Sequence, residues 1–135
     1  MLRMLPLRFP RLWLGLGWAA VVFAIVVCLV PMSKLPPANV SDKTEHFTAY
    51  LLLSLWFAGI YPRARYWIIA IGLCVLGVLI EFAQGAMHLG RHADAMDVLA
   101  NSTGIVAGLT LCWLGLGGWA QWIEALVTKT VVRKS

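Results

Sequence analysis

The stretch LWLGLGWAAVVFAIVVCLV, residues 12–30, contains 19 residues without a charge. The hydrocarbon core of a bilayer is about 30 Å thick, and an α-helix that rises 1.5 Å per residue needs about 20 apolar residues to cross it. Residues 12–30 are therefore predicted to form a membrane-spanning helix. The stretch is long for the apolar part of a signal peptide, and no small-residue cleavage site follows Val30, so we expect this span to be uncleaved.

Three further apolar runs follow, at residues 44–61, 66–89 and 96–117, and the connections between them are short and polar. Hydrophobic residues make up 61% of the chain and charged residues only 13%. A soluble domain has about 25% charged residues, so a water-soluble enzyme is excluded. Short connections between spans predict a compact antiparallel bundle of four transmembrane helices, an all-α membrane protein, within residues 1–118.

The basic residues predict the orientation of this bundle. The chain has 11 basic and 6 acidic residues, a formal charge of +5 that would also suit a nucleic-acid-binding protein. If the N-terminus is cytoplasmic, three basic residues lie outside (Lys34, Lys43 and Arg91) and all the others lie inside. This positive-inside bias places both termini in the cytoplasm. We therefore expect contact with anionic lipid and no nucleic-acid partner.

The segment after the fourth span, residues 119–135, has a helical pattern of its own. Apolar residues recur at i, i+3 and i+4 spacing, and basic residues follow them. The pattern comprises Trp119, Trp122, Ile123, Leu126 and Val127. It predicts a short amphipathic helix on the inner membrane surface, as an anchor rather than a docking site.

Polar residues of three spans fall at one depth, near the outer surface. Glu81 lies about 12 Å below the outer end of the third span by helical rise, and Gln84 shares its face. Asp94, Asp97 and Asn101 share one face at the start of the fourth span. The second span begins at the same side with Asp42, Lys43, Glu45, His46 and Tyr50. Five of the six acidic residues (all except Glu124) gather there.

A charge inside a membrane helix costs about 2.5 to 3.5 kcal/mol and usually marks a functional site or pathway. We interpret Glu81, Asp97 and His46 as candidate catalytic residues, with a carboxylate as general base and the imidazole as its proton shuttle. Candidate substrate-binding residues are Asp42, Lys43, Tyr50, Gln84, Arg91, Asp94 and Asn101. Lys43 or Arg91 is the expected countercation of Glu81.

A structural role remains open for each of these groups. The acidic residues of the spans can form a buried polar network, Asp42 and Lys43 can stabilise a helix start, and Tyr50 can be a packed aromatic. Gly104 and Gly108 are expected to pack against a neighbouring helix of the same chain. His88 and His92 have the spacing of metal ligands, but Gly90 between them is expected to break the helix, so no metal site is predicted. No cofactor is predicted either.

Several of these polar positions, in this order, resemble the VanZ-like family of small bacterial membrane proteins. The motifs are Asp42-Lys43-x-x-His46-Phe47-x-x-Tyr50, Glu81-x-x-Gln84 and Arg91-x-x-Asp94-x-x-Asp97-Val98-x-x-Asn101-x-x-Gly104. The resemblance covers residues 42–108. It implies a four-helix protein of the bacterial cytoplasmic membrane, in a family whose named member is associated with resistance to the glycopeptide teicoplanin. It implies no particular reaction.

Three functions are compatible with this pattern. The first is an enzyme that acts at the outer leaflet on an envelope lipid or its phosphorylated head group. The second is a non-catalytic binding or envelope-assembly protein that captures a lipid or a glycopeptide drug with the same residues. The third is a small proton-coupled or ion-coupled transporter, which the pattern favours least because no acid or base lies in the inner half of any span. The expected partners are membrane lipids and envelope lipid intermediates or glycopeptide.

Overall fold

The computed structural model describes residues 3–30, 41–87 and 94–132, with side chains up to residue 130. All regular elements in these ranges are helical, which confirms the predicted all-α class for this part of the chain. They are α1 (Pro10–Leu29), α2 (Asp42–Ile60), η2 (Arg63–Arg65), α3 (Tyr66–Met87), α4 (Ala95–Leu111), η3 (Cys112–Leu116) and α5 (Trp119–Val132). The segment η2 is a 3₁₀ turn and η3 is a π-helical turn.

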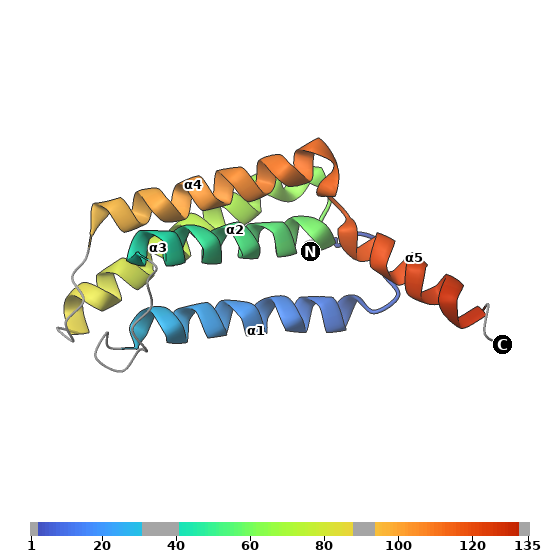
Figure 1. The fold of residues 1–135 in the computed structure, drawn as a ribbon, viewed down its shortest axis with the longest axis horizontal. Coiled ribbons are helices and arrows are strands. Elements are labelled where there is room, and N and C mark those ends of the chain that lie inside the picture. The colour runs from blue at the N-terminus through green and yellow to red at the C-terminus, as the bar shows by residue number, and fades with distance from the viewer. Residues whose placement is uncertain (1–2, 31–40, 88–93, 133–135) are drawn as a thin grey trace.

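Helices α1 to α4 pack together, and each runs opposite to the one before it (Figure 1). Helix α2 contacts α1, α3 and α4, and therefore forms the centre of the bundle. Because directions alternate, α2 and α4 run parallel and begin at the end where α3 finishes. The polar residues of these three helices consequently meet at one end of the bundle, as the sequence predicts.

The contact between α2 and α4 depends on two glycines. A Cβ atom on Gly104 would collide with the carbonyl oxygen of Phe47 and lie 3.0 Å from the amide nitrogen of Leu51. A Cβ atom on Gly108 would collide with the Ser54 hydroxyl and lie 2.8 Å from the Leu51 carbonyl oxygen. The glycines thus allow the two backbones to approach closely, as small residues do between membrane helices. The expected packing of this pair within the chain is confirmed.

The described surface and interior have the polarity expected of a protein in lipid. Large apolar side chains are exposed on the outside, with Phe23 70% and Phe82 72% exposed. The buried polar side chains are His46, Ser54, Glu81, Gln84, Asp97 and Asn101. A soluble protein of this size rarely exposes so much continuous apolar surface. The outer surface of the bundle therefore suits hydrocarbon rather than water.

Within the described residues, three helices are long and apolar enough to cross a membrane: Pro10–Leu29, Arg63–Met87 and Ala95–Leu116. They correspond to the predicted first, third and fourth spans. The predicted second span, except for Tyr61, lies within α2. This helix is less hydrophobic than the other three because its first turns carry Asp42, Lys43, Glu45 and His46. These polar residues lie where α2 contacts its neighbours, so the first turns of this central helix are more polar than those of the other helices.

The predicted fourth span, residues 96–117, is not one regular α-helix. The α-helical part ends at Leu111, and η3 follows with Gly115 at φ 150°. A positive φ of this size is accessible to glycine and strained for other residues. Gly118 has φ 76° and leads into α5. The glycines after Leu114 therefore end the span and turn the chain towards α5.

Helix α5 forms in the predicted tail and is tied to the start of α1. The Glu124 carboxylate accepts hydrogen bonds from the backbone N–H of Arg8 and Phe9, at 2.6 and 3.0 Å, and from the Trp13 indole at 2.8 Å. The backbone amides of Arg8 and Phe9 precede α1, so Glu124 acts from another helix much as an N-terminal cap does. The acidic residue outside the predicted cluster thus has a structural role.

Aromatic side chains fill the space between α1, α2 and α5. Trp13, Trp56 and Trp119 pack pairwise in tilted or edge-to-face arrangements, with ring centroids 5.2 to 5.8 Å apart. The Trp56 indole donates to the Trp13 carbonyl at 3.1 Å, and the Trp119 indole donates to the Leu55 carbonyl at 2.9 Å. Tryptophan suits the membrane interface because its ring is apolar while its N–H needs a partner.

Glu124→Gln is expected to lower the free energy of unfolding by about 1 kcal/mol at pH 7, the usual value of a helix cap. Burial alone would raise the pKa of Glu124, but the donors of Arg8, Trp13 and Phe9 outweigh it and hold this pKa below its ordinary value. The stabilisation by the charged form is therefore complete above the unfolded pKa of about 4.3 and disappears as pH falls through the lower folded pKa.

Thermal unfolding of both proteins in detergent micelles, followed by circular dichroism at pH 7 and pH 3, measures this difference. The variant should melt earlier at pH 7 and together with the parent at pH 3. An equal deficit at both values would show that the charge of Glu124 is not what holds α5 to α1.

Candidate functional site

The site lies at the end of the bundle where α2 and α4 begin. Ser41 caps α2 by accepting a hydrogen bond from the Thr44 amide at 3.3 Å, and Asp94 caps α4 through the Met96 amide at 2.8 Å. Both helices start here, so their dipoles place partial positive charge at this end. The first turns of these helices supply most of the predicted site residues, and the dipoles stabilise their carboxylates.

His46 lies at the centre of the site and is 1% exposed. Its Nδ1 lies 3.1 Å from Oδ1 of Asn101, a carbonyl oxygen that only accepts, so Nδ1 carries the proton. Its Nε2 faces two carboxylates, 3.9 Å from Oδ1 of Asp42 and 4.0 Å from Oδ2 of Asp97. These distances are too long for hydrogen bonds. The predicted association of His46 with Asp97 and Asn101 is thus present in the structure.

Lys43 extends across the mouth of the site from α2 to α4. Its Nζ donates to Oδ2 of Asp94 at 3.0 Å and lies 3.8 Å from Oδ1 of Asp97. The Met96 amide and then the Lys43 ammonium hold the pKa of Asp94 below its usual value. Asp94 is therefore an anion that fixes Lys43 in place, while Lys43 remains half exposed and able to meet a ligand.

Glu81 is bound differently from the expectation. Its Oε2 accepts a hydrogen bond from the Asp94 backbone amide at 3.0 Å, while Lys43 is paired with the side chain of Asp94 instead. Lys43 is therefore not the partner of Glu81 in the structure. The predicted alternative partner, Arg91, lies outside the described residues, as do His88 and His92.

Gln84 and Tyr50 lie in the interior beside the site. The Gln84 amide donates to the Cys28 carbonyl at 2.8 Å and so ties α3 to α1. Tyr50 is 1% exposed, and its hydroxyl would lie 3.3 Å from a Cβ on Gly77. Both side chains are thus enclosed rather than open to the surface. Their observed contacts are structural ones.

Five buried polar atoms of the described residues have no hydrogen-bond partner: His46 Nε2, Tyr50 Oη, Glu81 Oε1, Asp97 Oδ1 and Asn101 Nδ2. All five belong to predicted site residues. A buried polar atom without a partner costs about 1 to 3 kcal/mol, so such atoms are rare unless a ligand or a water satisfies them. Their accumulation in one place is the property that separates this site from a saturated structural network.

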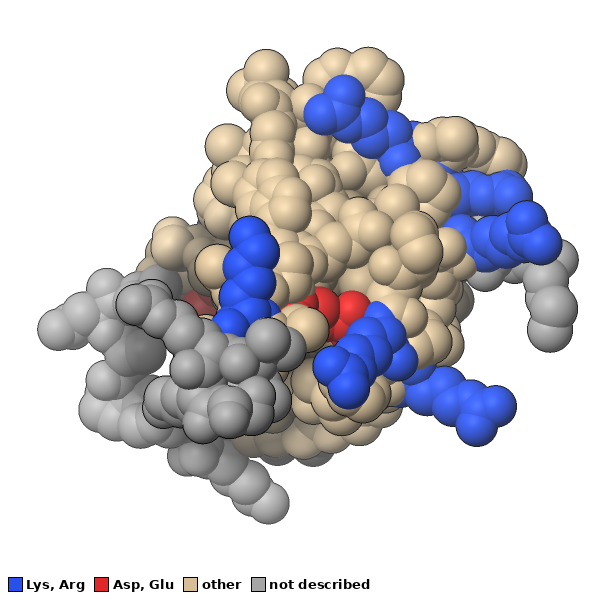
Figure 2. All heavy atoms as spheres, turned by 90° about the vertical axis from the view of Figure 1, so that its right-hand side faces the viewer, with Lys and Arg blue, Asp and Glu red and all other residues tan. Residues whose placement is uncertain are grey.

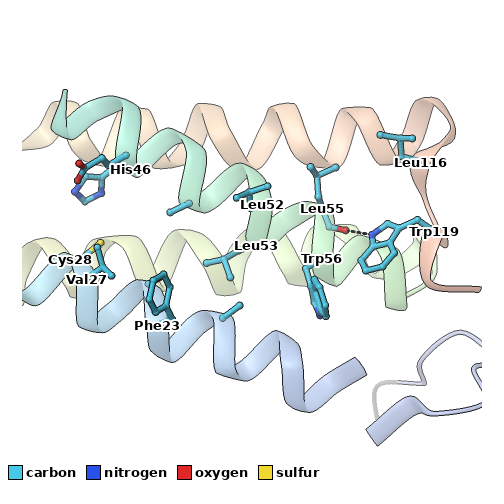
Figure 3. Close-up of a pocket in the computed structure, with 14 residues that line it drawn as sticks. Phe23, Val27, Cys28, His46, Leu52, Leu53, Leu55, Trp56, Leu116 and Trp119 are labelled. Atoms are coloured by element: carbon cyan, nitrogen blue, oxygen red, sulfur yellow. Dashed lines mark hydrogen bonds between the residues drawn. The ribbon is translucent and has the colours of Figure 1, made fainter. Parts of the chain in front are cut away.

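An apolar groove of about 630 Å³ leads away from the site between α1 and α2. Figure 3 shows Phe23 and Val27 on one side and Leu53 on the other, with His46 at one end and Trp119 at the opposite end. From His46 to Trp56, α2 advances about 15 Å by helical rise. The groove thus connects the polar site to the tryptophan cluster.

Two features of the site are not evident from the sequence. One is the groove, for which the sequence holds no signal because it results from the separation of α1 and α2. The other is the position of Asp42 beside His46 and Asp97, which brings the ligand atoms of the three residues within 4.8 Å of one another. The spacing of Asp42 and His46, four residues apart on one helix face, is a signal that could have suggested this group.

Comparison of the chain with protein family models, with curated proteins and with solved structures gave no match.

Proposed function

We propose that this protein binds an envelope lipid in the plane of the membrane, with the lipid chain in the groove between α1 and α2 and an anionic head group at the polar site. The observation that carries the proposal is the direct connection of an apolar groove to a cluster of unpartnered polar atoms. A lipid combines an apolar chain with a polar head group. Phe23 lines the groove and is 70% exposed, so the groove faces the surrounding hydrocarbon at this residue.

The length of the groove suits one leaflet. Its extent along α2 is about 15 Å, half of the hydrocarbon thickness of about 30 Å. A lipid chain lying in the groove would therefore end near the midplane with its head group beside His46. Lys43, half exposed at the mouth, supplies a positive charge for a phosphate.

The distribution of basic residues supports a topology in which the site faces outward. Figure 2 views the opposite end of the bundle and shows Lys and Arg side chains around it. The described basic residues of that end are Arg3, Arg8, Arg11, Arg63, Arg65 and Lys129. By the positive-inside rule this end is cytoplasmic, which implies four spans including α2, cytoplasmic termini and α5 at the inner surface. The proposed location is the bacterial cytoplasmic membrane.

We include membership of the VanZ-like family in the proposal. It is supported by the clustering of residues from all three quoted motifs, namely His46 from the first, Glu81 from the second, and Asp97 and Asn101 from the third. A role in resistance to the glycopeptide teicoplanin would follow from binding or changing a lipid that carries cell-wall material.

A catalytic version of the proposal is favoured by the carboxylates. Glu81 Oε1 and Asp97 Oδ1 are buried acceptors without a hydrogen-bond partner, as a general base awaiting its proton requires. The non-catalytic version uses the same residues as ligands. Transport is less favoured, because beyond His46 the buried polar groups of α2 are the hydroxyls of Tyr50 and Ser54, and this part of the helix has no buried carboxylate or imidazole.

Filling the groove tests the proposal. Ala24 lines it and is partly buried, so Ala24→Phe is expected to reduce co-purified lipid at least fivefold by occupying its space. Val22, on the same helix but outside the groove and 57% exposed, provides the matched variant Val22→Phe, which should retain lipid. Native mass spectrometry of the purified proteins measures the bound lipid. Equal lipid in both variants would contradict binding in the groove.

Mass spectrometry of the lipids distinguishes the catalytic version of the proposal from the non-catalytic one. Purified protein is incubated with an extract of envelope lipids, and the molecular masses of the lipids are then measured. A changed lipid mass supports an enzyme, whereas unchanged lipid that remains bound supports a binding protein. Lipidomics of a strain without the protein identifies the lipid that accumulates.

A further inference from the structure

We propose that Asp42, His46 and Asp97 bind a zinc ion. Each contributes one ligand atom, and these atoms lie within 4.8 Å of one another. Two of the three side chains are almost fully enclosed, His46 with 1% and Asp97 with 3% of its surface exposed. The inference rests on these three residues and holds whether or not a lipid occupies the groove.

The orientation of His46 suits a positive ion between its ring and the two carboxylates. Its Nδ1 donates to the Asn101 carbonyl oxygen, so in the neutral ring Nε2 presents a lone pair. This lone pair faces carboxylate oxygens of Asp42 and Asp97 at 3.9 and 4.0 Å, an arrangement of three electron donors with no hydrogen bond between them. Lys43 Nζ, 3.8 Å from Oδ1 of Asp97, offsets part of the negative charge, and a metal ion at the centre would accept electron pairs from all three donors.

The separations favour zinc over magnesium. Zinc ligands lie about 2.0 to 2.2 Å from the metal, so neighbouring ligands in a tetrahedral site are about 3.4 Å apart. Octahedral magnesium brings neighbouring ligands to about 3.0 Å and prefers oxygen alone. Small rotations of Asp42 and Asp97 bring their oxygens to the zinc distance. An imidazole with two carboxylates is also a ligand set that suits zinc.

The surroundings of the group resemble those of metal ligands. Asn101 holds the second nitrogen of the ring, as outer partners of a metal-binding histidine do, and thereby fixes the tautomer. Two carboxylates neutralise the charge of a zinc ion, which is necessary at a site this enclosed. Asp42, with 36% of its side chain exposed, leaves one side open. Three protein ligands and one open position are the pattern of reactive zinc sites.

If the proposed lipid binding is also correct, the open position takes an oxygen of the anionic head group, next to Lys43. In that case His46 acts as a ligand rather than as a proton shuttle, and Glu81 remains the available base. This last step rests on the proposed function, whereas the presence of zinc does not.

The test uses the full chain, purified in detergent micelles. Bound metal is removed with a chelator, the protein is dialysed against zinc chloride, and the zinc content is measured by inductively coupled plasma mass spectrometry. One zinc per chain is expected. Asp42→Asn and His46→Gln, which keep side-chain size, should each weaken zinc binding at least tenfold. Glu45→Gln removes a neighbouring charge of the same helix turn without removing a ligand, and should keep one zinc per chain.

Thermal unfolding establishes that each variant is folded, and Asp42→Asn is the decisive one because this side chain is partly exposed. Cobalt chloride in place of zinc gives a second readout, since four-coordinate cobalt absorbs visible light strongly and six-coordinate cobalt weakly. No retained metal, or equal zinc in Asp42→Asn and Glu45→Gln, would overturn the proposal. Lipid retention by the same samples is scored separately, so the two proposals can fail independently.

Discussion

Replacing Gly104 with alanine is expected to lower the free energy of unfolding by about 2 to 3 kcal/mol, the range of an overpacked core. The added Cβ would collide with the Phe47 carbonyl oxygen and lie 3.0 Å from the Leu51 amide nitrogen. Both obstacles are backbone atoms of the central helix α2, which cannot move aside as a flexible side chain can. Titration with sodium dodecyl sulfate, followed by circular dichroism, measures the loss.

Gly15→Ala is the matched control for this change. A Cβ on Gly15 meets nothing within 4 Å, and alanine is the better helix former by about 1 kcal/mol. This variant should be as stable as the parent or slightly more stable. If Gly104→Ala behaved like Gly15→Ala, the close approach of α2 and α4 would not be a feature of the folded protein.

In the catalytic version of the proposed function, Glu81→Gln is expected to reduce lipid conversion by about 10²- to 10⁴-fold, the contribution of a general base. Glutamine has the size of glutamate, and its carbonyl oxygen can still accept the hydrogen bond that Glu81 accepts from the Asp94 amide at 3.0 Å. The fold and lipid binding should therefore persist, while the ability to take a proton is lost. The measurement is the rate at which the mass of the added lipid changes.

Glu124→Gln serves as the comparison, because it removes an acid at the opposite end of the bundle. It should convert lipid at the parent rate in conditions where it is folded. Full activity in Glu81→Gln would exclude this carboxylate as the base. Unaltered binding together with lost conversion would assign it to the chemical step.

Much of the site could be predicted from sequence because helices impose simple rules. Asp94, Asp97 and Asn101 share a face by their spacing, and alternating spans bring that face to the depth of Glu81 and His46. The structure places the described members of this group at one end, joined by His46–Asn101 and Glu81–Asp94 contacts. These predictions depend on helical geometry alone, which side-chain packing hardly alters.

The pairing of charges could not be predicted in the same way. Lys43 binds Asp94 rather than Glu81, and Gln84 binds the backbone of α1 at Cys28. Which partner a side chain takes depends on the rotation of each helix about its axis and on the distance between helices. Those quantities follow from contacts such as that of Gly104 with α2, between segments distant in the sequence.

The sequence by itself determined that the chain is helical, that its long segments suit a membrane, and that its acids gather at one end. These properties follow from the length and polarity of local segments, because a helix in hydrocarbon satisfies its backbone hydrogen bonds within itself. Only the tertiary structure decided that Asp42, His46 and Asp97 face one another, and that a groove opens between α1 and α2. Both result from the way helices pack, which sets distances that spacing along one helix does not contain.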